Sequence, residues 1–149
     1  MRKIFLDTNV LLDYILRRPG SHHVDAIIEL ASGNKWMHLY VSYLSMANTA
    51  YIIRKRLPED IRECLAELSG WVNILPMNDM QFMTAIRDCK SPDFEDALQI
   101  MCAEEKECDL ILTNNATHFK SYTEIPVMTP SEFLSHLDHT AGRNSRDDG

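Results

Sequence analysis

Short strand-like and helix-like segments alternate from one end of the chain to the other, and this alternation limits the fold more than any other feature. Five apolar runs are typical of buried strands, at residues 3–6, 39–42, 72–75, 109–113 and 126–128. Segments with apolar residues at helical spacing separate these runs. Because strands joined through helices pair in parallel with right-handed crossovers, we expect an α/β fold with a doubly wound, mainly parallel five-stranded sheet between two layers of helices.

Residues that begin and end helices mark the helical segments. We expect helices at about residues 10–17, 21–33, 44–56, 58–69, 79–88, 92–107 and 130–137. Ser91, Pro92 and Asp93 are typical of a helix start, as a capping residue, a first helical residue and an acid in the first turn. Residues 129–132 form a capping box at the start of the last helix. Between the last two strands we expect a polar loop.

The chain is long enough for one domain with a sizeable core. Its 149 residues are 45% hydrophobic and 25% charged, which is ordinary for a globular domain. We place this domain at residues 1–137 and expect residues 138–149, which have almost no apolar content, to be disordered. The longest apolar stretches fall far short of the ~20 residues of a membrane helix, and residues 1–6 lack the features of a signal peptide.

The net charge and the cysteines indicate which partners and which cellular location to expect. The net charge of −7 predicts no strong general attraction to a polyanion, so contact with nucleic acid requires a local basic patch or a metal ion. The cysteines at positions 64, 89, 102 and 108 form no C-x-x-C pair. We expect them to be reduced thiols, which together with the missing export signal predicts a cytoplasmic location.

Small polar residues follow three of the expected strands. Asp7, Thr8 and Asn9 come directly after the first strand, Ser42 ends the second, and residues 113–115 (Thr-Asn-Asn) end the fourth. The carboxyl ends of parallel strands meet at one edge of the sheet, where open α/β sheets bind their ligands. We therefore expect these residues to share one site.

A helix that begins near the same edge adds acidic residues. Asp93 and Asp96 are three positions apart, so both project from one side of its first turns. Together with Asp7 they make three carboxylates with no obvious lysine or arginine between them. Such carboxylates repel one another unless a cation lies among them, and oxygen ligands favour Mg²⁺ or Mn²⁺. A site of this kind supports attack of metal-activated water on a phosphodiester.

Each of these acids also has a purely structural explanation. Asp7 can cap the helix that follows it, and Asp93 can stabilise the dipole of its helix. Asp96 is harder to explain in this way, because aspartate is a poor helix former. The combination therefore predicts a metal site more strongly than any one residue does.

Three segments resemble the PIN-domain family of metal-dependent nucleases, which includes the VapC-type toxins. They are residues 5–13 (FLDTNVLLD), 93–99 (DFEDALQ) and 109–115 (DLILTNN), the last followed by His118. The resemblance extends over residues 2–137 and implies a five-stranded sheet of order 3-2-1-4-5. It also implies that Asp7 and Asp96 bind the metal, and that Asp93 is a further acid found in part of the family.

Two positions depart from the family pattern. Asn48 stands where the resemblance places a glutamate, and Asn115 stands where it places an aspartate. Members of the family with asparagine at the second position often have an aspartate three residues later, and here that residue is His118. Asparagine can bind a metal through its carbonyl oxygen but brings no charge, so we expect weaker metal affinity. His118 can shuttle a proton or contact phosphate, or lie on a surface loop without such a role.

The resemblance implies a Mg²⁺- or Mn²⁺-dependent endoribonuclease that cleaves single-stranded RNA, with Asp7, Asp93 and Asp96 as catalytic and metal-binding residues. It further implies a homodimer and an antitoxin protein that covers the acidic edge. The alternative is a PIN-like domain without catalytic activity that binds RNA or a protein. The residues expected to support the site or contact the substrate are Thr8, Asn9, Asn48, Thr113, Asn115 and His118.

Overall fold

A five-stranded sheet forms the centre of the computed structural model, which describes residues 2–56 and 61–144. Its strands lie in the order β3-β2-β1-β4-β5, and all four pairings between them are parallel. In the register of the sheet, Ile4 pairs with Leu39 on one side and Leu110 on the other. The predicted doubly wound sheet and its strand order are confirmed. The strands are β1 (Arg2–Leu6), β2 (Met37–Ser42), β3 (Asn73–Leu75), β4 (Leu110–Leu112) and β5 (Val127–Met128).

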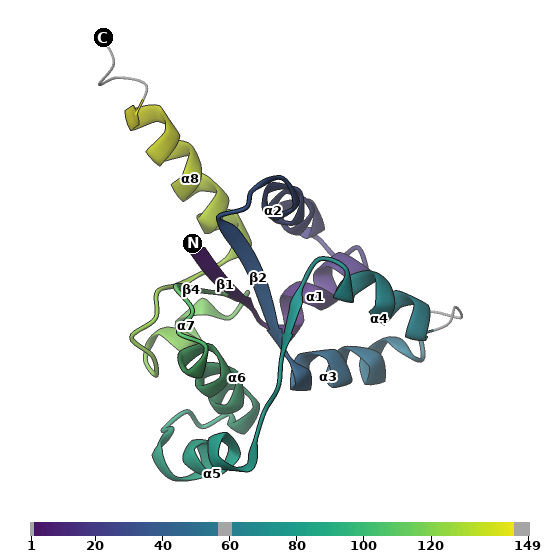
Figure 1. The fold of residues 1–149 in the computed structure, drawn as a ribbon, viewed down its shortest axis with the longest axis vertical. Coiled ribbons are helices and arrows are strands. Elements are labelled where there is room, and N and C mark those ends of the chain that lie inside the picture. The colour runs from purple at the N-terminus through teal and green to yellow at the C-terminus, as the bar shows by residue number, and fades with distance from the viewer. Residues whose placement is uncertain (1, 57–60, 145–149) are drawn as a thin grey trace.

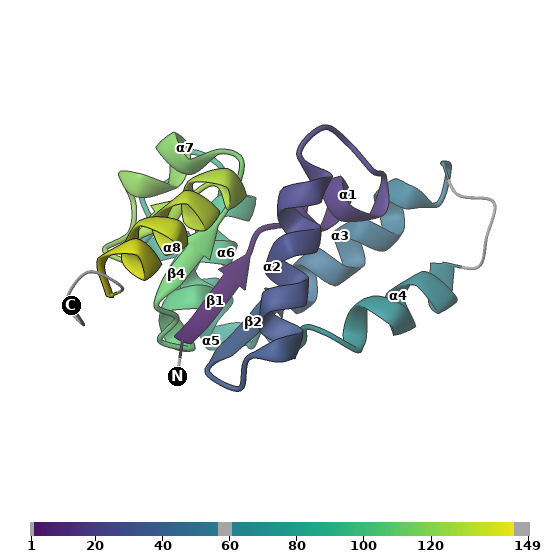
Figure 2. The ribbon, with the colours of Figure 1, turned by 90° about the horizontal axis from the view of Figure 1, so that it is seen from above.

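Helices cover both faces of this sheet. Helices α1 to α4 lie on one side of the strands and α5 to α7 on the other (Figure 1). Seen from above, α2 and α8 lie in front of the strands (Figure 2), and these two helices pack against each other. None of the helices in the described ranges is both long and apolar enough to cross a membrane. The helices are α1 (Thr8–Ile15), α2 (Ser21–Gly33), α3 (Tyr43–Ile53), α4 (Ile61–Ser69), α5 (Asp79–Asp88), α6 (Phe94–Glu105), α7 (Ala116–Lys120) and α8 (Pro130–Asn144).

Side chains that alternate along β1 enter two separate cores. Ile4 points to one face and packs in a cluster that includes Ile27 of α2 and Phe133 of α8. Phe5 points to the other face and packs with Phe119 of α7 in a second cluster. Each of these side chains is fully buried or nearly so, and burying one stabilises the fold by about 1.5–3 kcal/mol relative to leaving it exposed. Because both faces of the central strands are covered, their sequences are continuously apolar rather than alternating.

Helix α6 begins later than the sequence predicts. Its N-cap is Asp93, whose side chain accepts a hydrogen bond from the backbone N–H of Asp96. The prediction that Ser91 caps this helix and that Asp93 lies in its first turn was therefore wrong. The carboxylate of Asp93 makes the capping bond itself, so the helix starts at Phe94.

A short helix takes the place of part of the predicted polar loop after β4. Helix α7 has five residues and no side-chain hydrogen bond at its N-cap, Asn115. Ala116 and Phe119 attach it to the core beneath β4 and β5. Five residues are too few to show a helical period in the sequence, and tertiary packing holds the segment instead.

Helix α8 extends beyond its predicted end at residue 137. Residues 138–144, which we expected in a disordered tail, continue the helix. The hydroxyl of Thr140 bonds the backbone carbonyls of His136 and Leu137 at 3.0 and 2.9 Å, and no proline interrupts the segment. Residues 145–149 of the predicted tail, and residues 58–60 of the predicted helix at 58–69, lie outside the described residues.

Candidate active site

Asp7 lies at the carboxyl end of β1 and is the N-cap of α1. Its side chain is only 6% exposed. Each carboxylate oxygen accepts two hydrogen bonds. Oδ1 accepts from the backbone N–H of Thr8 at 2.8 Å and from Nε2 of Gln99 at 3.1 Å. Oδ2 accepts from Nδ2 of Asn9 at 3.0 Å and from the hydroxyl of Thr113 at 2.8 Å. Asp7 thus caps a helix, but its other three bonds fix the carboxylate far more firmly than a cap requires.

The ends of β1 and β4 meet at this carboxylate. Besides its bond to Asp7, Thr113 accepts the backbone N–H of Asn115 at 3.1 Å. Asn9 uses its Oδ1 to accept the backbone N–H of Asn114 at 3.2 Å. Nδ2 of Asn114 in turn donates to Asp13 of α1 at 2.5 Å. The expectation that these polar strand ends share one edge is borne out by the structure.

The end of β2 approaches the same carboxylate from the interior. Ser42 caps α3 by accepting the backbone N–H of Ser45 at 2.9 Å. The hydroxyls of Ser45 and Thr8 are 2.9 Å apart, and both residues are buried. The side chain of Thr8 is therefore buried beside the core, and its hydroxyl bonds Ser45.

Asp96 stands among other carboxylates on the solvent side of Asp7. Partial burial, followed by the negative charges of Asp93, Asp7 and Glu95, raises the pKa of Asp96 from 3.8 to about 6, while His118 acts in the opposite direction. The Asp96 carboxylate accepts no hydrogen bond within the part of the chain that the structure describes. Three acids and one histidine thus act electrostatically on a single unpaired carboxyl group.

Asn48 reaches across from α3 to α6. Its Nδ2 donates to Oε1 of Glu95 at 2.9 Å, so Asn48, which stands where the family resemblance places a glutamate, is hydrogen bonded to a glutamate of another helix. The sequence places Glu95 with Asp93 and Asp96 at the start of this helix, but it does not mark Glu95 as a site residue. Its only signal was membership of the acidic run 93–96.

Asn115 and His118 lie at the rim of the site. Both are exposed, the first as the N-cap of α7 and the second within it. His118 is close enough to Asp96 to lower the pKa of that group. The structure therefore brings His118 toward the acids and places it on a helix rather than on a loop.

The donor set fits a hard divalent cation. Neither a lysine nor an arginine forms an ion pair with Asp7, Asp93, Asp96 or Glu95 in residues 2–56 and 61–144. The same ranges contain no group of three His, Cys, Asp or Glu side chains already gathered closely enough to hold a metal. Mg²⁺ commonly uses one or two carboxylates and keeps several waters, so a compact three-acid cage is not required. The uncompensated charge around Asp96 is the feature that a cation would neutralise.

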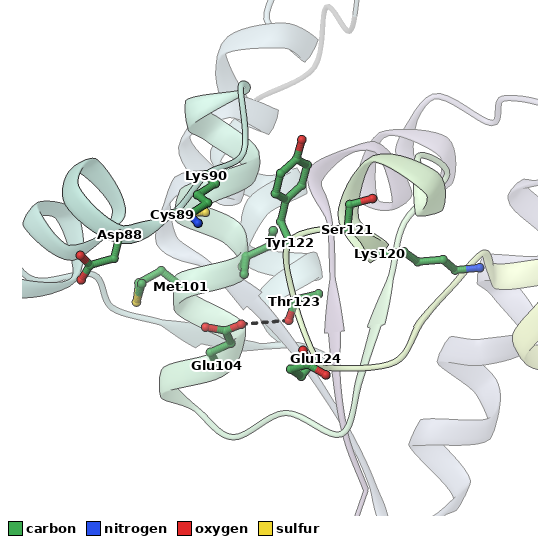
Figure 3. A pocket seen from close by; sticks show the side chains of 11 residues that line it. Asp88, Cys89, Lys90, Met101, Glu104, Lys120, Ser121, Tyr122, Thr123 and Glu124 are labelled. Atoms are coloured by element: carbon green, nitrogen blue, oxygen red, sulfur yellow. Dashed lines mark hydrogen bonds between the residues drawn. The ribbon is translucent and has the colours of Figure 1, made fainter.

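A cavity of about 400 Å³ lies elsewhere, between α6 and the segment that joins α7 to β5 (Figure 3). Glu104 and Thr123 face each other across it and are hydrogen bonded at 2.9 Å (Figure 3). None of the predicted site residues lines it. The candidate site is therefore the acidic edge and not this cavity.

A parallel sheet of order 3-2-1-4-5 with carboxylates at its carboxyl edge is the arrangement that the resemblance to PIN domains predicts. Residues 3–117 match the PIN domain family, and the chain belongs to that family.

Individual relatives agree with this assignment. Ribonuclease VapC1 of Aquifex aeolicus (strain VF5) is 30% identical over 139 residues, which make up 88% of this chain and 92% of the relative. Among solved structures, the chain is similar to VapBC2 from Rickettsia felis bound to a promoter DNA fragment, with a TM-score of 0.67 and 16% identity, covering 85% of this chain and 98% of the other. It is also similar to VapBC-1 from nontypeable Haemophilus influenzae, with a TM-score of 0.66 and 17% identity, covering 87% and 98%. These two structures support the fold.

Proposed function

We propose that this protein is a divalent-metal-dependent endoribonuclease that cleaves phosphodiester bonds of single-stranded RNA. The observation that carries the proposal is the unpaired carboxyl group of Asp96, whose pKa is raised by burial and by Asp93, Asp7 and Glu95. A cation bound beside this group would neutralise the negative charges that surround it. The relative from Aquifex aeolicus that bears the name ribonuclease supports the same activity.

In this proposal Asp7, Asp93 and Asp96 hold Mg²⁺ or Mn²⁺. When bound, the ion supplies a water of lowered pKa and neutralises charge on the phosphate. Asn9 and Thr113 orient the carboxylate of Asp7, and Asn48 orients that of Glu95. At the rim, Asn115 and His118 are exposed, and in this proposal they contact a phosphate of the substrate.

The test is cleavage of unstructured and structured RNA by the wild type and by Asp96→Asn, with Mg²⁺, with Mn²⁺ and with a chelator. We expect the wild type to cleave unstructured RNA only when metal is present, and Asp96→Asn to be inactive while remaining folded, with a melting temperature no lower than that of the wild type. Cleavage by the wild type in chelator, or full activity of the variant, would overturn the proposal.

A binding module without catalytic activity is the second candidate, favoured by the neutral side chains of Asn48 and Asn115. Titration calorimetry with Mn²⁺ separates the two. A nuclease takes up Mn²⁺ near neutral pH, whereas a pure binding module that retains RNA affinity shows no such uptake.

The family relationship also leads us to propose two protein partners. One is an antitoxin that covers the acidic edge, and the other is a second copy of the chain. Exposed apolar side chains on α5, among them Phe82 and Ile86 at 44% and 53% exposure, offer a surface for the dimer. Light scattering of the wild type and of Phe82→Ser tests it, and a wild type that is monomeric at all concentrations contradicts it.

A further inference from the structure

A glutamine in the interior joins the acidic edge to the core. Gln99 lies on α6 between Leu98 and Ile100 and has no exposed surface. Its carboxamide is surrounded by polar groups from three other elements. Nε2 lies 2.6 Å from the hydroxyl of Ser45 and 3.1 Å from Oδ1 of Asp7, and Oε1 accepts the hydroxyl of Ser42 at 2.5 Å.

The carboxylate of Asp7 settles which way this carboxamide points. The hydroxyl of Ser42 accepts the backbone N–H of Ser45 and lies 2.5 Å from Oε1 of Gln99 and 3.1 Å from the hydroxyl of Ser45, so it can donate to Oε1. The Nε2 group is then directed at Asp7. With the amide turned over, Oε1 would face a carboxylate oxygen and two acceptors would meet without a hydrogen between them. The network therefore supports one orientation only.

Core stability alone does not account for a glutamine at this position. An apolar side chain would fill the same interior space without the desolvation cost of a primary amide. A buried polar network in which each member is satisfied makes its parts rigid. Ser42, Ser45 and Gln99 are all fully buried. Their hydrogen-bond network extends to the carboxylate of Asp7 and holds it in one orientation.

Gln99 also links the two acids of the site through one helix. It follows Asp96 by three residues on α6, so the two side chains come from adjacent turns. Asp96 lies toward solvent, and Gln99 holds Asp7 from inside. Helix α6 thereby sets the position of one acid directly and the orientation of the other through a hydrogen bond.

We propose that Gln99 is a positioning residue for the Asp7 carboxylate, and this inference rests on the proposed metal-dependent nuclease function. Without the amide, Oδ1 of Asp7 keeps only the bond from the backbone N–H of Thr8. The carboxylate then has more freedom to turn away from the arrangement in which it shares a cation with Asp96. Groups that orient a metal-binding carboxylate in this way commonly contribute about 10- to 100-fold to metal affinity or activity.

The test compares Gln99→Met with the wild type and with Ile100→Val. Methionine keeps the length of the side chain and removes the amide. Ile100→Val alters the neighbouring core position on the same helix, where the side chain packs with Phe5 and Phe119 rather than with the site. For each protein the measurements are the dissociation constant for Mn²⁺ by calorimetry, kcat and KM on unstructured RNA, and the melting temperature.

We expect Gln99→Met to bind Mn²⁺ about 10- to 100-fold more weakly and to lose kcat by a similar factor with KM unchanged, while Ile100→Val retains both values despite its altered core. Ser42→Ala, which releases the other end of the carboxamide, should weaken Mn²⁺ binding less than Gln99→Met. Wild-type Mn²⁺ affinity and kcat in Gln99→Met would overturn this inference and leave the nuclease function standing. A wild type that neither binds Mn²⁺ nor cleaves RNA would overturn both.

Discussion

The side-chain amide of Asn48 donates to Oε1 of Glu95 across 2.9 Å, which joins α3 to the first turn of α6. The neutral residue thus holds a charged one in the region of Asp96, and Glu95 contributes to the raised pKa of that residue. Asn48, at the position where the sequence resemblance places a glutamate, is thus hydrogen bonded to a glutamate from a different helix.

Replacement of Glu95 by glutamine should weaken Mn²⁺ binding. Glu95 is exposed, so its attraction for a cation is screened and the loss should be modest, about 0.5–1 kcal/mol. Titration calorimetry at low and high salt measures the loss, which should shrink as salt is added. Glu105→Gln at the other end of α6 removes the same charge far from the site, and equal effects of the two variants would contradict a specific role for Glu95.

Asp7→Asn should abolish cleavage and also destabilise the protein. The new amide places a donor where Oδ1 or Oδ2 accepts two hydrogen bonds. Leaving buried donors without an acceptor costs about 1–3 kcal/mol. Urea unfolding measures the loss of stability, and RNA cleavage is assayed below the midpoint of unfolding. A variant that cleaves RNA at the wild-type rate contradicts the assignment of Asp7.

Asp96 should give the metal-free protein a distinct dependence on pH. The pKa of Asp96 is about 6 in the folded protein, against an ordinary value of 3.8. The folded state therefore binds this proton more tightly than the unfolded state. The stability that the protonated group contributes is fully present below about pH 3.8 and is lost as the pH rises through about 6.

The side chain that Asp96→Asn introduces cannot ionise. As the pH rises from about 3.8 to about 6, this variant should therefore lose less stability than the wild type. Urea unfolding at several pH values in chelator compares the two proteins. Parallel stability curves would contradict the raised pKa. With Mn²⁺ present, uptake of the ion by the wild type should release a proton near pH 6, because the carboxyl group must ionise to bind it.

Thr113→Val should reduce both stability and activity. The hydroxyl of Thr113 donates to Asp7 and accepts the backbone N–H of Asn115. It also accepts a hydrogen bond from Nδ2 of Asn9 at 3.4 Å, so three bonds are lost at the end of β4. We expect a cost of about 1–2 kcal/mol in urea unfolding. Thr113→Ser keeps the hydroxyl and should recover most of the loss, and a serine variant no better than valine would show that the methyl group matters instead.

A chain that ends after residue 137 should fold and keep its activity. Leu137 packs against the core cluster that contains Phe133, whereas residues 138–140 are exposed. Removing the end of α8 should cost less than about 1 kcal/mol, because surface positions contribute little. Thermal unfolding and RNA cleavage of the shortened chain check this placement of the domain end, and failure to fold would contradict it.

The sheet and the acidic edge could be predicted because their signals are local. The apolar run of β1 stops at Asp7, and the polar residues after β4 begin at Thr113, so the pattern marks where each strand ends. Parallel pairing then brings the two ends together. The order of the strands, by contrast, was available only through the family resemblance.

Other parts of the site depend on tertiary packing and could not be predicted. Gln99 lies in the run from Ala97 to Ile100, all of it buried, and nothing in the period of the helix shows that a glutamine there points at Asp7. A polar residue within an otherwise apolar stretch was the only signal. The short helix α7 and the link from Asn48 to Glu95 have no sequence signal at all, because they are set by which helices become neighbours.

The bond between Asp7 and Thr113 joins residues 106 positions apart. While the chain is being synthesised, the first acid of the site emerges early and its partners on α6 and β4 follow only after most of the protein has been made. Until β4 pairs with β1, the Asp7 carboxylate lacks its hydrogen bond from Thr113. Under the proposed nuclease function, a chain that ends before β4 therefore lacks the contact that ties the first acid of the site to the neighbouring strand.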